Sequence, residues 1–419
     1  MLIKLLALLL LVFAAPAFAN TANPDGFDEW LASFKERASR SIPADEVERA
    51  LAGVRFIPAI VELDRRQPEF AISFHRYYHN TVTQARIQRG REMLRTHAAI
   101  LDEVSQRYGV QPHIIMALWG METNFGGFMG VHRTVDGLAT MAFDPRRSAF
   151  FTEQLMAAVR IIAAGHKTPD SRGSWAGAFG HFQFMPTTFE RYAVDGDGDG
   201  RIDFFNSMPD SFASASNYLS RLGWNGRQRW GRPVRLARDT DELWAQVNSF
   251  EQLTVREFSR LGVVAHDGSR LPNSDMMGML IAPNGARGPM FLVYNNFNLI
   301  MRWNAAQSYA LAVGLLADHI AGAGVTLEWP EGADEPPLSF EQIRGVQRRL
   351  QELGLFDANL TGRLGRQTMR GVKAYQNLLL AGDRRVSPDG TPIRYYASGR
   401  RIRPDGHPTR DTLVIMGLE

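Results

Sequence analysis

Three observations predict a mainly α-helical chain with a small sheet and a helical C-terminal module. Apolar residues recur at helical spacing in several segments between residues 27 and 324, whereas strand signals are few. The segment 277–294 is the best candidate for a small sheet. A Pro-rich acidic stretch without periodicity, residues 329–337, then reads as a linker to a tail with its own helical pattern.

The individual helices follow from the positions of their apolar residues. Segments 91–108 and 148–165 each place apolar side chains on one stripe, and segment 304–320 is rich in Ala and Leu. In the tail, helical spacing relates Ile343, Val346, Leu350 and Leu353, and Gly354 lies where a helix C-cap is expected.

The N-terminus has the pattern of a secretory signal peptide over residues 1–19. Lys4 precedes an apolar run at 5–13, and Ala17-Phe18-Ala19 has the small-x-small form of a cleavage site. The alternative is a transmembrane anchor, but the run is shorter than the roughly 20 residues that a span needs. We therefore expect export and a soluble periplasmic protein.

Composition excludes several chemistries. The sequence contains no cysteine, which excludes disulfides, thiol catalysis and zinc-thiolate sites. It also excludes the acylated cysteine of a bacterial lipoprotein. Stability must then come from the apolar core or from a bound metal.

Charge is distributed unevenly along the chain. Residues 338–419 contain 14 Lys and Arg against 8 Asp and Glu, whereas residues 20–337 contain 32 against 36. A basic tail can bind nucleic acid, anionic lipid or an anionic polymer. Export argues against nucleic acid, and cell-wall peptides carry carboxylates. An ordinary solvated surface remains the alternative.

Glu122 is the candidate catalytic side chain. Pro112 suits the first turn of a helix and Gly126-Gly127 its end. Within it Glu122 follows Ile115 by seven residues, which places the carboxyl group on the apolar stripe. No Lys or Arg lies one turn away, so we expect desolvation to raise its pKa. A glutamic acid that stays protonated can donate to a glycosidic oxygen. A buried structural glutamate is the alternative.

The surrounding motifs resemble the lytic transglycosylase B family, which has a lysozyme-like α+β catalytic core. The resemblance spans residues 27–323. Its motifs are Ala-Leu-Trp-Gly-Met-Glu-Thr-Asn-Phe-Gly (117–126), Gly-Ser-Trp-Ala-Gly-Ala-Phe-Gly-His-Phe-Gln-Phe-Met-Pro (173–186), Arg-Trp-Asn (302–304) with Tyr309, and Leu-Asp-Arg-Arg-Gln-Pro-Glu-Phe (63–70) with Tyr77.

The resemblance implies an activity and a set of site residues. The family cleaves the β-1,4 bond between N-acetylmuramic acid and N-acetylglucosamine in peptidoglycan and leaves a 1,6-anhydro end. Glu122 would be the acid and base. A hydrolytic muramidase and a non-catalytic wall-binding scaffold are the alternatives. The positions that match the family's sugar groove are Tyr77, Ser174, Gln183, Trp303, Asn304 and Tyr309.

Two of the matched motifs depart from the family pattern. Trp303 and His181 stand where tyrosine occurs in some members. Trp303 can still stack on a sugar but loses a hydroxyl contact. We interpret Phe182 and Phe184 as core residues.

An acidic loop predicts a calcium site. Asp195, Asp197 and Asp199 occupy positions 1, 3 and 5 of an EF-hand-like loop, and Arg201 can offer its carbonyl oxygen from position 7. Position 12 lacks the usual glutamate. The resemblance suggests a later aspartate, for which Asp210 is the candidate. An acidic turn without metal is the alternative.

The tail resembles a peptidoglycan-binding module of three short helices. The resemblance lies in Val-Gln-Arg-Arg-Leu-Gln-Glu-Leu-Gly-Leu-Phe (346–356), Thr-Gly-Arg-Leu-Gly (361–365) and Ala-Tyr-Gln (374–376), and an insertion at about 381–403 separates its halves. We therefore expect a catalytic domain at 20–328, a linker at 329–337 and a binding domain at 338–419. The alternative is a module that docks on the enzyme or on a protein partner. Glycan strands are the expected partner.

Overall fold

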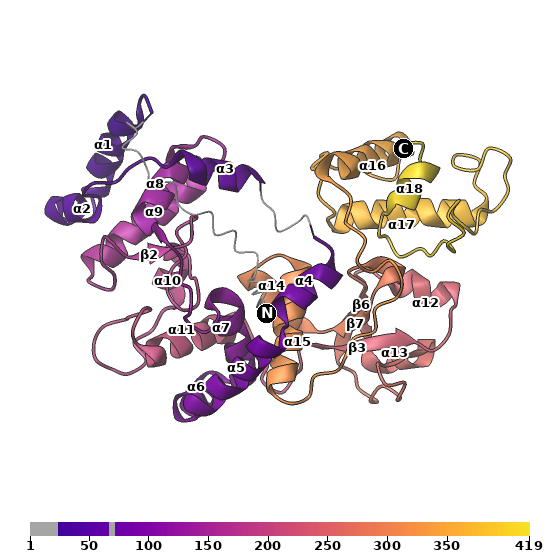
Figure 1. Ribbon diagram of the computed structural model, residues 1–419, viewed down its shortest axis with the longest axis horizontal. Coiled ribbons are helices and arrows are strands. Elements are labelled where there is room, and N and C mark those ends of the chain that lie inside the picture. Colours follow the sequence, from indigo (N-terminus) through magenta and orange to yellow (C-terminus); the bar gives the residue numbers. More distant parts are fainter. Residues whose placement is uncertain (1–23, 67–71) are drawn as a thin grey trace, which may run out of the picture. The chain divides into compact units, whose positions relative to one another are not determined.

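The computed structural model describes residues 24–66 and 72–419, so the signal segment 1–19 lies outside the described residues. The chain forms two compact units (Figure 1). The N-terminal unit comprises Met1–Arg66 and Thr83–Leu222, and the C-terminal unit comprises Gln67–Val82 and Gly223–Glu419.

The N-terminal unit is almost entirely helical. One apolar cluster joins its first helices to α8 and α9, which lie side by side (Figure 1). Its helices are α1 Phe27–Ala38, α2 Ala44–Ala50, α3 Pro58–Arg66, α5 Gln84–Thr96, α6 Ala98–Tyr108, α7 Pro112–Thr123, α8 Thr134–Phe143, α9 Ser148–Ala163, α10 Pro186–Tyr192 and α11 Met208–Arg221. Its two short strands, β1 His132–Arg133 and β2 Arg172–Gly173, pair antiparallel.

The segment 91–108 forms parts of two helices, so the sequence prediction of one helix was wrong at this point. Helix α5 ends at Thr96 and α6 begins at Ala98. His97 between them has φ −107° and ψ 20°, outside the α-helical region. Its ring contacts those of Trp119 and Phe212, with centroids 5.6 and 5.4 Å away. Periodicity alone does not report such a break, because the same apolar stripe continues across it.

The C-terminal unit contains a five-stranded antiparallel sheet with strand order β4-β6-β7-β3-β5. The strands are β3 Gly231–Leu236, β4 Leu253–Thr254, β5 Val263–Ala265, β6 Met277–Ile281 and β7 Met290–Val293. Strands β6 and β7 confirm the prediction of a sheet within 277–294. The sequence analysis missed β3, which contains Pro233 and two arginines and therefore lacks an alternating apolar pattern.

The remaining helices of this unit include three in the tail. They are α4 Phe74–Thr81, α12 Asp241–Gln246, α13 Val255–Leu261, α14 Asn295–Trp303, α15 Gln307–Ile320, α16 Phe340–Glu352, α17 Arg366–Ala381 and α18 Arg410–Ile415, with a short 3₁₀ turn at Gly285–Arg287. Ser339 and Gln342 form a capping box at the start of α16. Gly354, with φ +69°, follows its C-cap Leu353, close to the predicted position. The mainly helical fold class is confirmed.

Residues 329–337, the expected linker, are packed against the C-terminal unit. The ring of Trp329 lies 4.7 Å from that of His75 and 5.5 Å from that of Tyr78. Glu335 forms ion pairs with Arg287 and with Arg400. The compact unit that begins at Gly223 continues through this segment into the tail.

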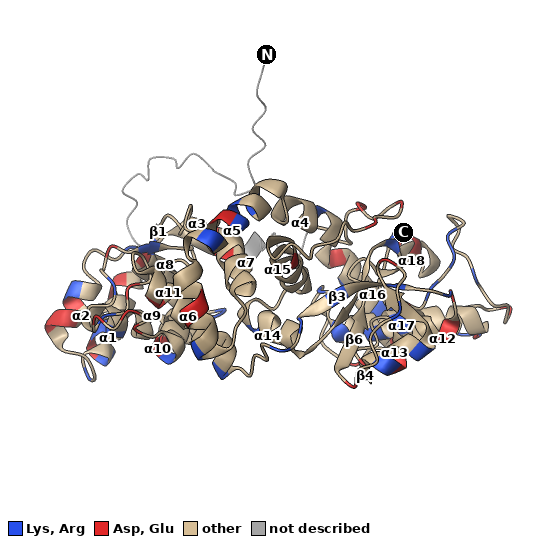
Figure 2. Cartoon of the chain, turned by 90° about the horizontal axis from the view of Figure 1, so that it is seen from below, with Lys and Arg blue, Asp and Glu red and all other residues tan. Residues whose placement is uncertain are grey.

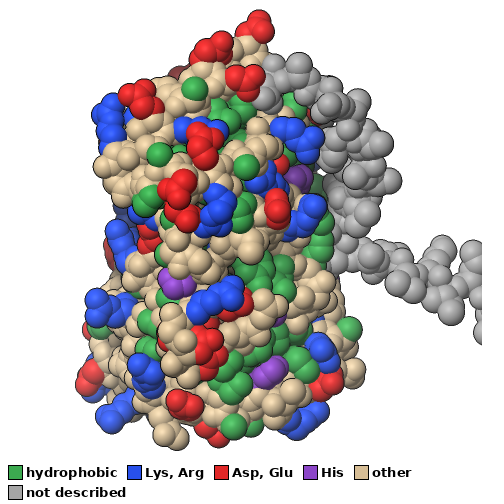
Figure 3. Space-filling view, turned by 90° about the vertical axis from the view of Figure 1, so that its left-hand side faces the viewer, with side chains coloured by type: hydrophobic (Ala, Val, Ile, Leu, Met, Phe, Trp, Pro, Cys, Tyr) green, Lys and Arg blue, Asp and Glu red, His purple; other side chains and the backbone are tan. Residues whose placement is uncertain are grey.

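The described helices and surface carry mixed charge. Both acidic and basic side chains occur on α1 and α2 (Figure 2). On the face drawn in Figure 3, acidic and basic side chains are interspersed. Within the described residues, no helix is long and apolar enough to cross a membrane.

Candidate functional site

Helix α7 presents Glu122 from an otherwise buried element. Pro112 occupies its first turn, as expected. All residues from Ile114 to Gly120 are buried, and so is Thr123, whereas Glu122 is only partly buried. Ile115, which the sequence places on the same stripe as Glu122, lies in the core, and so do Leu118 and Trp119. Glu122 therefore lies in the last turn of a buried helix, at a position where the side chain is partly exposed.

The chain leaves α7 through three consecutive left-handed residues. Asn124, Phe125 and Gly126 have φ values of +50°, +59° and +77°. The helix therefore ends three residues before the predicted Gly126. Thr123 stabilises the turn, because its Oγ1 accepts a hydrogen bond from the N–H of Gly126 at 3.1 Å. Non-glycine residues rarely adopt this conformation, so tertiary packing must hold the turn that follows Glu122.

His181, in the second motif, accepts hydrogen bonds from two residues of α7 next to this turn. The indole N–H of Trp119 donates to its Nδ1 at 3.0 Å, and the hydroxyl of Thr123 donates to its carbonyl oxygen at 2.8 Å. His181 is buried, and burial lowers its pKa. A Cβ at Gly126 would lie 2.7 Å from its ring, so only glycine permits this approach.

Sequence reasoning noted His181 as a departure from tyrosine but missed its structural role. A buried tryptophan needs an acceptor for its N–H, and that need was the available signal. Nothing in the sequence identified the acceptor. Phe182 and Phe184 are confirmed as core residues.

Ser174 and Gln183 lie in the loop that connects β2 to α10. The Ser174 hydroxyl accepts a hydrogen bond from the N–H of Ala178 at 3.0 Å, and Gln183 has a φ of +48°. The Gln183 side-chain amide donates to the carbonyl oxygens of Met129 at 3.1 Å and Gly180 at 3.0 Å. The bond to Met129 ties this loop to the segment that follows α7. Both residues remain partly exposed.

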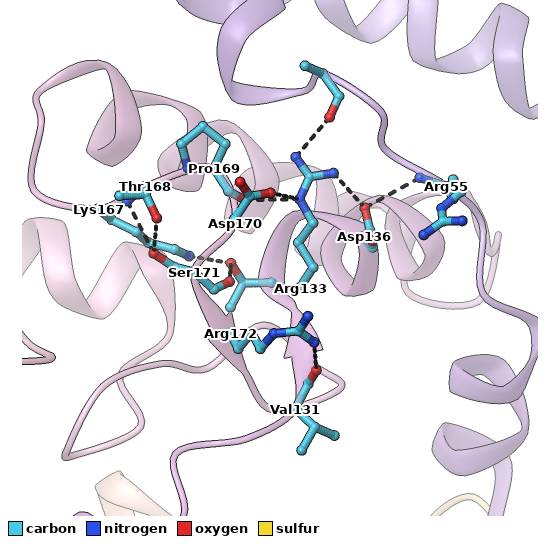
Figure 4. A network of polar contacts seen from close by, with 12 residues as sticks. Arg55, Val131, Arg133, Asp136, Lys167, Thr168, Pro169, Asp170, Ser171 and Arg172 are labelled. Atoms are coloured by element: carbon cyan, nitrogen blue, oxygen red, sulfur yellow. Dashed lines mark hydrogen bonds and ion pairs between the residues drawn. The ribbon is translucent and has the colours of Figure 1, made fainter. Parts of the chain in front are cut away.

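A polar network anchors the base of this loop (Figure 4). Arg133 donates to the carbonyl oxygens of Pro169 and Ala52, and its guanidinium pairs with Asp136. Arg172 donates to the carbonyl oxygen of Val131 at 2.6 Å. These contacts hold β1 against β2, directly before Ser174.

Lys167 is a buried cation beneath the same loop. Its ammonium group hydrogen bonds to the hydroxyl of Thr134 and lies 4.3 Å from the ring centroid of Phe179. Burial lowers its pKa to about 7. Phe179 pairs with Phe184 across the loop through main-chain hydrogen bonds, so Lys167 supports the segment that carries Gln183.

Three carboxylates gather at the acidic loop. Ligand atoms of Asp195, Asp197 and Asp210 lie within 4.8 Å of one another. Asp210 also accepts hydrogen bonds from the N–H groups of Gly196 and Asp203, which fixes it toward the loop. Burial raises the pKa of Asp210, and the nearby carboxylate of Asp197 acts in the same direction. An oxygen-only set of this kind suits a hard cation.

Asp199 lies outside this group of three carboxylates. The carboxylate of Asp199 accepts a hydrogen bond from the N–H of Arg201 at 2.8 Å. Asp210 lies in the first turn of α11, where its N–H donates a hydrogen bond to the hydroxyl of the N-cap Ser207 at 3.2 Å.

The other four expected groove residues belong to the C-terminal unit. Tyr77 lies on α4 and is partly buried. Trp303 ends α14, and Asn304 follows it as an exposed C-cap whose Oδ1 accepts from the N–H of Ala306 at 3.0 Å. Tyr309 lies on α15 and is 5% exposed, so its ring belongs to the interior of this unit. Residues 67–70 of the upstream motif lie outside the described residues.

Comparison with known proteins identifies the family. Residues 26–318 match the model of the transglycosylase SLT domain. Membrane-bound lytic murein transglycosylase B of Escherichia coli K12 is 27% identical over 320 residues, covering 74% of this chain and 85% of that protein.

Two solved structures are similar over most of their length. SltB3 of Pseudomonas aeruginosa, in complex with NAG-anhNAM-pentapeptide, is 36% identical with a TM-score of 0.83, covering 94% of this chain and 100% of that one. Escherichia coli Slt35, in complex with calcium, is 26% identical with a TM-score of 0.60, covering 71% and 94%. The chain therefore belongs to the transglycosylase SLT domain family, the lytic transglycosylases of peptidoglycan.

Proposed function

We propose that the chain cleaves the β-1,4 bond between N-acetylmuramic acid and N-acetylglucosamine, with Glu122 as its one acid and base. The observation that carries the proposal is the position of Glu122. It lies in the last turn of a buried helix, and Trp119 and Thr123 of that turn are hydrogen-bonded to His181 of the second motif. A proton donor held this firmly can be aimed at a glycosidic oxygen.

In this reaction one carboxyl group acts first as an acid and then as a base. Glu122 first donates its proton to the leaving oxygen as the C1–O bond breaks. The muramyl 6-hydroxyl then attacks C1, and its proton returns to the carboxylate. Atoms balance without water, and the products are a 1,6-anhydromuramyl end and a free N-acetylglucosamine end. The acetamido group of the sugar would stabilise the oxocarbenium-like intermediate.

Ser174 and Gln183 are proposed to bind the sugar chain beside Glu122. Both stay partly exposed on a loop whose base is held by the Arg133 network. Tyr77, Trp303, Asn304 and Tyr309, which belong to the C-terminal unit, are proposed as further sugar-binding residues. Trp303 is partly buried and Asn304 is exposed, which supports a sugar contact for both. Tyr309, being buried, would act through packing.

We further propose that Asp195, Asp197 and Asp210 hold a calcium ion that stabilises the loop, with support from Asp199 and the carbonyl oxygen of Arg201. The fit of the carboxylate group to a hard cation supports this assignment. The ion would have a structural role, because Glu122 needs no metal for proton transfer.

The proposed location is the periplasm, in soluble form. The sequence contains no cysteine for lipid attachment, and residues 1–19 have the pattern of a signal peptide. The basic tail, residues 338–419, is proposed to bind the cell wall.

Digestion of purified sacculi tests the reaction. Mass spectrometry of the products should show 1,6-anhydromuramyl ends. Reducing muramyl ends would instead assign a hydrolytic muramidase, and an unchanged sacculus would assign a wall-binding scaffold.

A further inference from the structure

A cavity of about 840 Å³ lies within the C-terminal unit, whereas Glu122 belongs to the N-terminal unit. Its walls come from β3 and the residues after it, from the segment 328–331, and from tail residues between 376 and 411. The sheet and the tail module therefore build this cavity together. Its size falls within the range of about 300–1,000 Å³ typical of ligand sites.

Polar contacts connect the tail to the sheet region, and these two parts form the walls of the cavity. Lys373 of the tail donates to the carbonyl oxygens of Trp244, Ala245 and Val247, at 3.0, 2.7 and 2.5 Å. These carbonyl groups lie at the end of α12, where a cation is favourable. The contacts fix the tail against the sheet region on one side of the cavity.

Asp405 provides a second connection. Its carbonyl oxygen accepts from the buried side chain of Asn248 at 2.8 Å, and its carboxylate accepts from the N–H of Ala286 at 2.7 Å. Gly285 has φ +58°, and a Cβ there would lie 2.7 Å from the Cβ of His407, so the two loops meet without space for a side chain. The cavity is therefore preformed.

Charged side chains of both signs line the cavity. Six arginines line the cavity: Arg235, Arg238, Arg287, Arg400, Arg401 and Arg403. Five carboxylates line it as well: Asp239, Glu328, Glu331, Asp405 and Asp411. The charges are thus mixed, with a small positive excess.

The arginines outnumber the carboxylates that they contact. Asp239 is shared by Arg401 and Arg403. Asp405 is occupied by N–H donors, including the side-chain amide of Gln376 at 3.0 Å. Within the described residues, neither Arg235 nor Arg238 forms an ion pair with a carboxylate, and both are exposed. Guanidinium N–H groups therefore remain available at this site.

Two buried polar atoms at the cavity have no hydrogen-bond partner among the described residues. They are Nη1 of Arg403 and Nδ1 of His407. The guanidinium of Arg403 lies over the ring of Trp244, with Cζ 5.7 Å from the ring centroid, and its Nη2 contacts Asp239. Both atoms are enclosed by neighbouring groups, so they are not direct contact points for a ligand in the cavity.

We propose that this cavity binds the peptide stems of peptidoglycan through their carboxylates, with Arg235 and Arg238 as the principal donors. The choice of peptide rests on the proposed function. Guanidinium groups bind carboxylates with paired hydrogen bonds. Glu328 and Glu331 would accept the amino group of a zwitterionic stem, and Trp244 would cover its aliphatic part. A polyanion fits less well, because five carboxylates line the same walls.

Calorimetric titration of the full chain with soluble stem pentapeptide tests the proposal. The double variant Arg235→Gln, Arg238→Gln should weaken Kd at least tenfold. The control, Arg260→Gln with Arg348→Gln, removes the same charge from exposed positions outside the cavity and should bind as the unmodified chain does. Equal melting temperatures of the two double variants would show that folding is preserved.

Two further probes identify the ligand chemistry. The same pentapeptide with its carboxylates amidated should not bind, and equimolar acetate or inorganic phosphate should not compete. A Kd that is equal in the cavity variant and the unmodified chain would overturn the proposal, as would acetate binding as tightly as the peptide. Binding is measured without cleavage, so a failure of the proposed glycan reaction would appear only in the product analysis of sacculi.

Discussion

The indole N–H of Trp119 donates a 3.0 Å hydrogen bond to Nδ1 of His181. This contact joins helix α7, which carries Glu122, to the loop that carries Ser174 and Gln183. Both partners are buried, so the bond is protected from competition with water. It makes the two sequence motifs one structural element.

Replacing His181 tests this connection. His181→Phe should lower the free energy of unfolding by about 1–3 kcal/mol, because it leaves the Trp119 N–H buried without an acceptor. It should also lower turnover more than it changes KM, since the turn after Glu122 loses support. His181→Tyr restores an oxygen acceptor and should recover most of the activity. Urea denaturation and glycan cleavage assays measure both effects. Equal losses in the two variants would contradict the role of the hydrogen bond.

His181 also predicts a dependence of stability on pH. Burial lowers its pKa below the ordinary value of 6.5, so the unfolded chain binds the proton more readily. Its contribution to stability is complete above pH 6.5 and is lost as the pH falls from there toward the folded-state pKa. The His181→Tyr variant should therefore show a smaller loss of stability between pH 7 and pH 5 than the unmodified chain.

The buried Lys167 predicts a dependence of stability on pH above neutrality. Its pKa of about 7 in the folded chain lies below the ordinary value of 10.5, so stability should increase as the pH rises from 7 to 10.5. Lys167→Met should remove this increase and should stabilise the chain by about 1 kcal/mol at pH 6.5, where the buried ammonium is charged. Urea denaturation at pH 6.5, 8 and 9.5 measures the slope. The same slope in both proteins would show that Lys167 is not buried as described.

Calcium should raise the melting temperature of metal-stripped protein, since a ligand that binds only the folded state stabilises it. The increase should disappear in Asp195→Asn with Asp210→Asn. Asp102→Asn, an exposed residue of α6 in the same unit, is the matched control and should keep it. Asp199→Asn should lose less of the increase than either of the two metal-site substitutions alone. Identical melting curves with and without calcium would contradict the proposed calcium site.

The contact of Lys373 predicts that the tail is part of the stability of the C-terminal unit. Lys373→Met removes three hydrogen bonds to carbonyl oxygens and should cost roughly 2 kcal/mol. It should also expose residues 329–337 to limited proteolysis. Arg370→Met, an exposed position on the same helix, is the control and should leave both measurements unchanged. Equal cleavage rates in the two variants would show that the tail is held by other contacts.

The parts of the fold that the sequence predicted are those with a local signal. The helix that contains Glu122 has an apolar stripe and a proline at its start, and the α16 helix has both a periodic face and a glycine after its end. Strand β3 has no such signal, because its place in the sheet is decided by pairing with β7 and β5, which are distant in sequence.

The same distinction applies to the candidate site. Glu122 and the aspartates of the acidic loop belong to short sequence motifs in which the chemistry requires those residues at those positions. The hydrogen bonds from Trp119 and Thr123 to His181 join residues about 60 positions apart, and no local pattern reports them. The docking of Lys373 and Asp405 on the sheet region is likewise a tertiary feature, invisible to composition or periodicity.

Glu122→Gln is the most direct test of the proposed mechanism. Glutamine keeps the shape of the side chain but cannot donate and recover a proton. Glu103→Gln, at an exposed position on α6, is the matched control. The measurement is the yield of 1,6-anhydromuramyl ends from purified sacculi by mass spectrometry, with equal melting temperatures confirming that all three proteins fold. We predict that the yield falls at least a thousandfold in Glu122→Gln, about the upper part of the range for loss of general acid–base catalysis, and is unchanged in Glu103→Gln. A yield from Glu122→Gln equal to that of the unmodified chain would contradict the account.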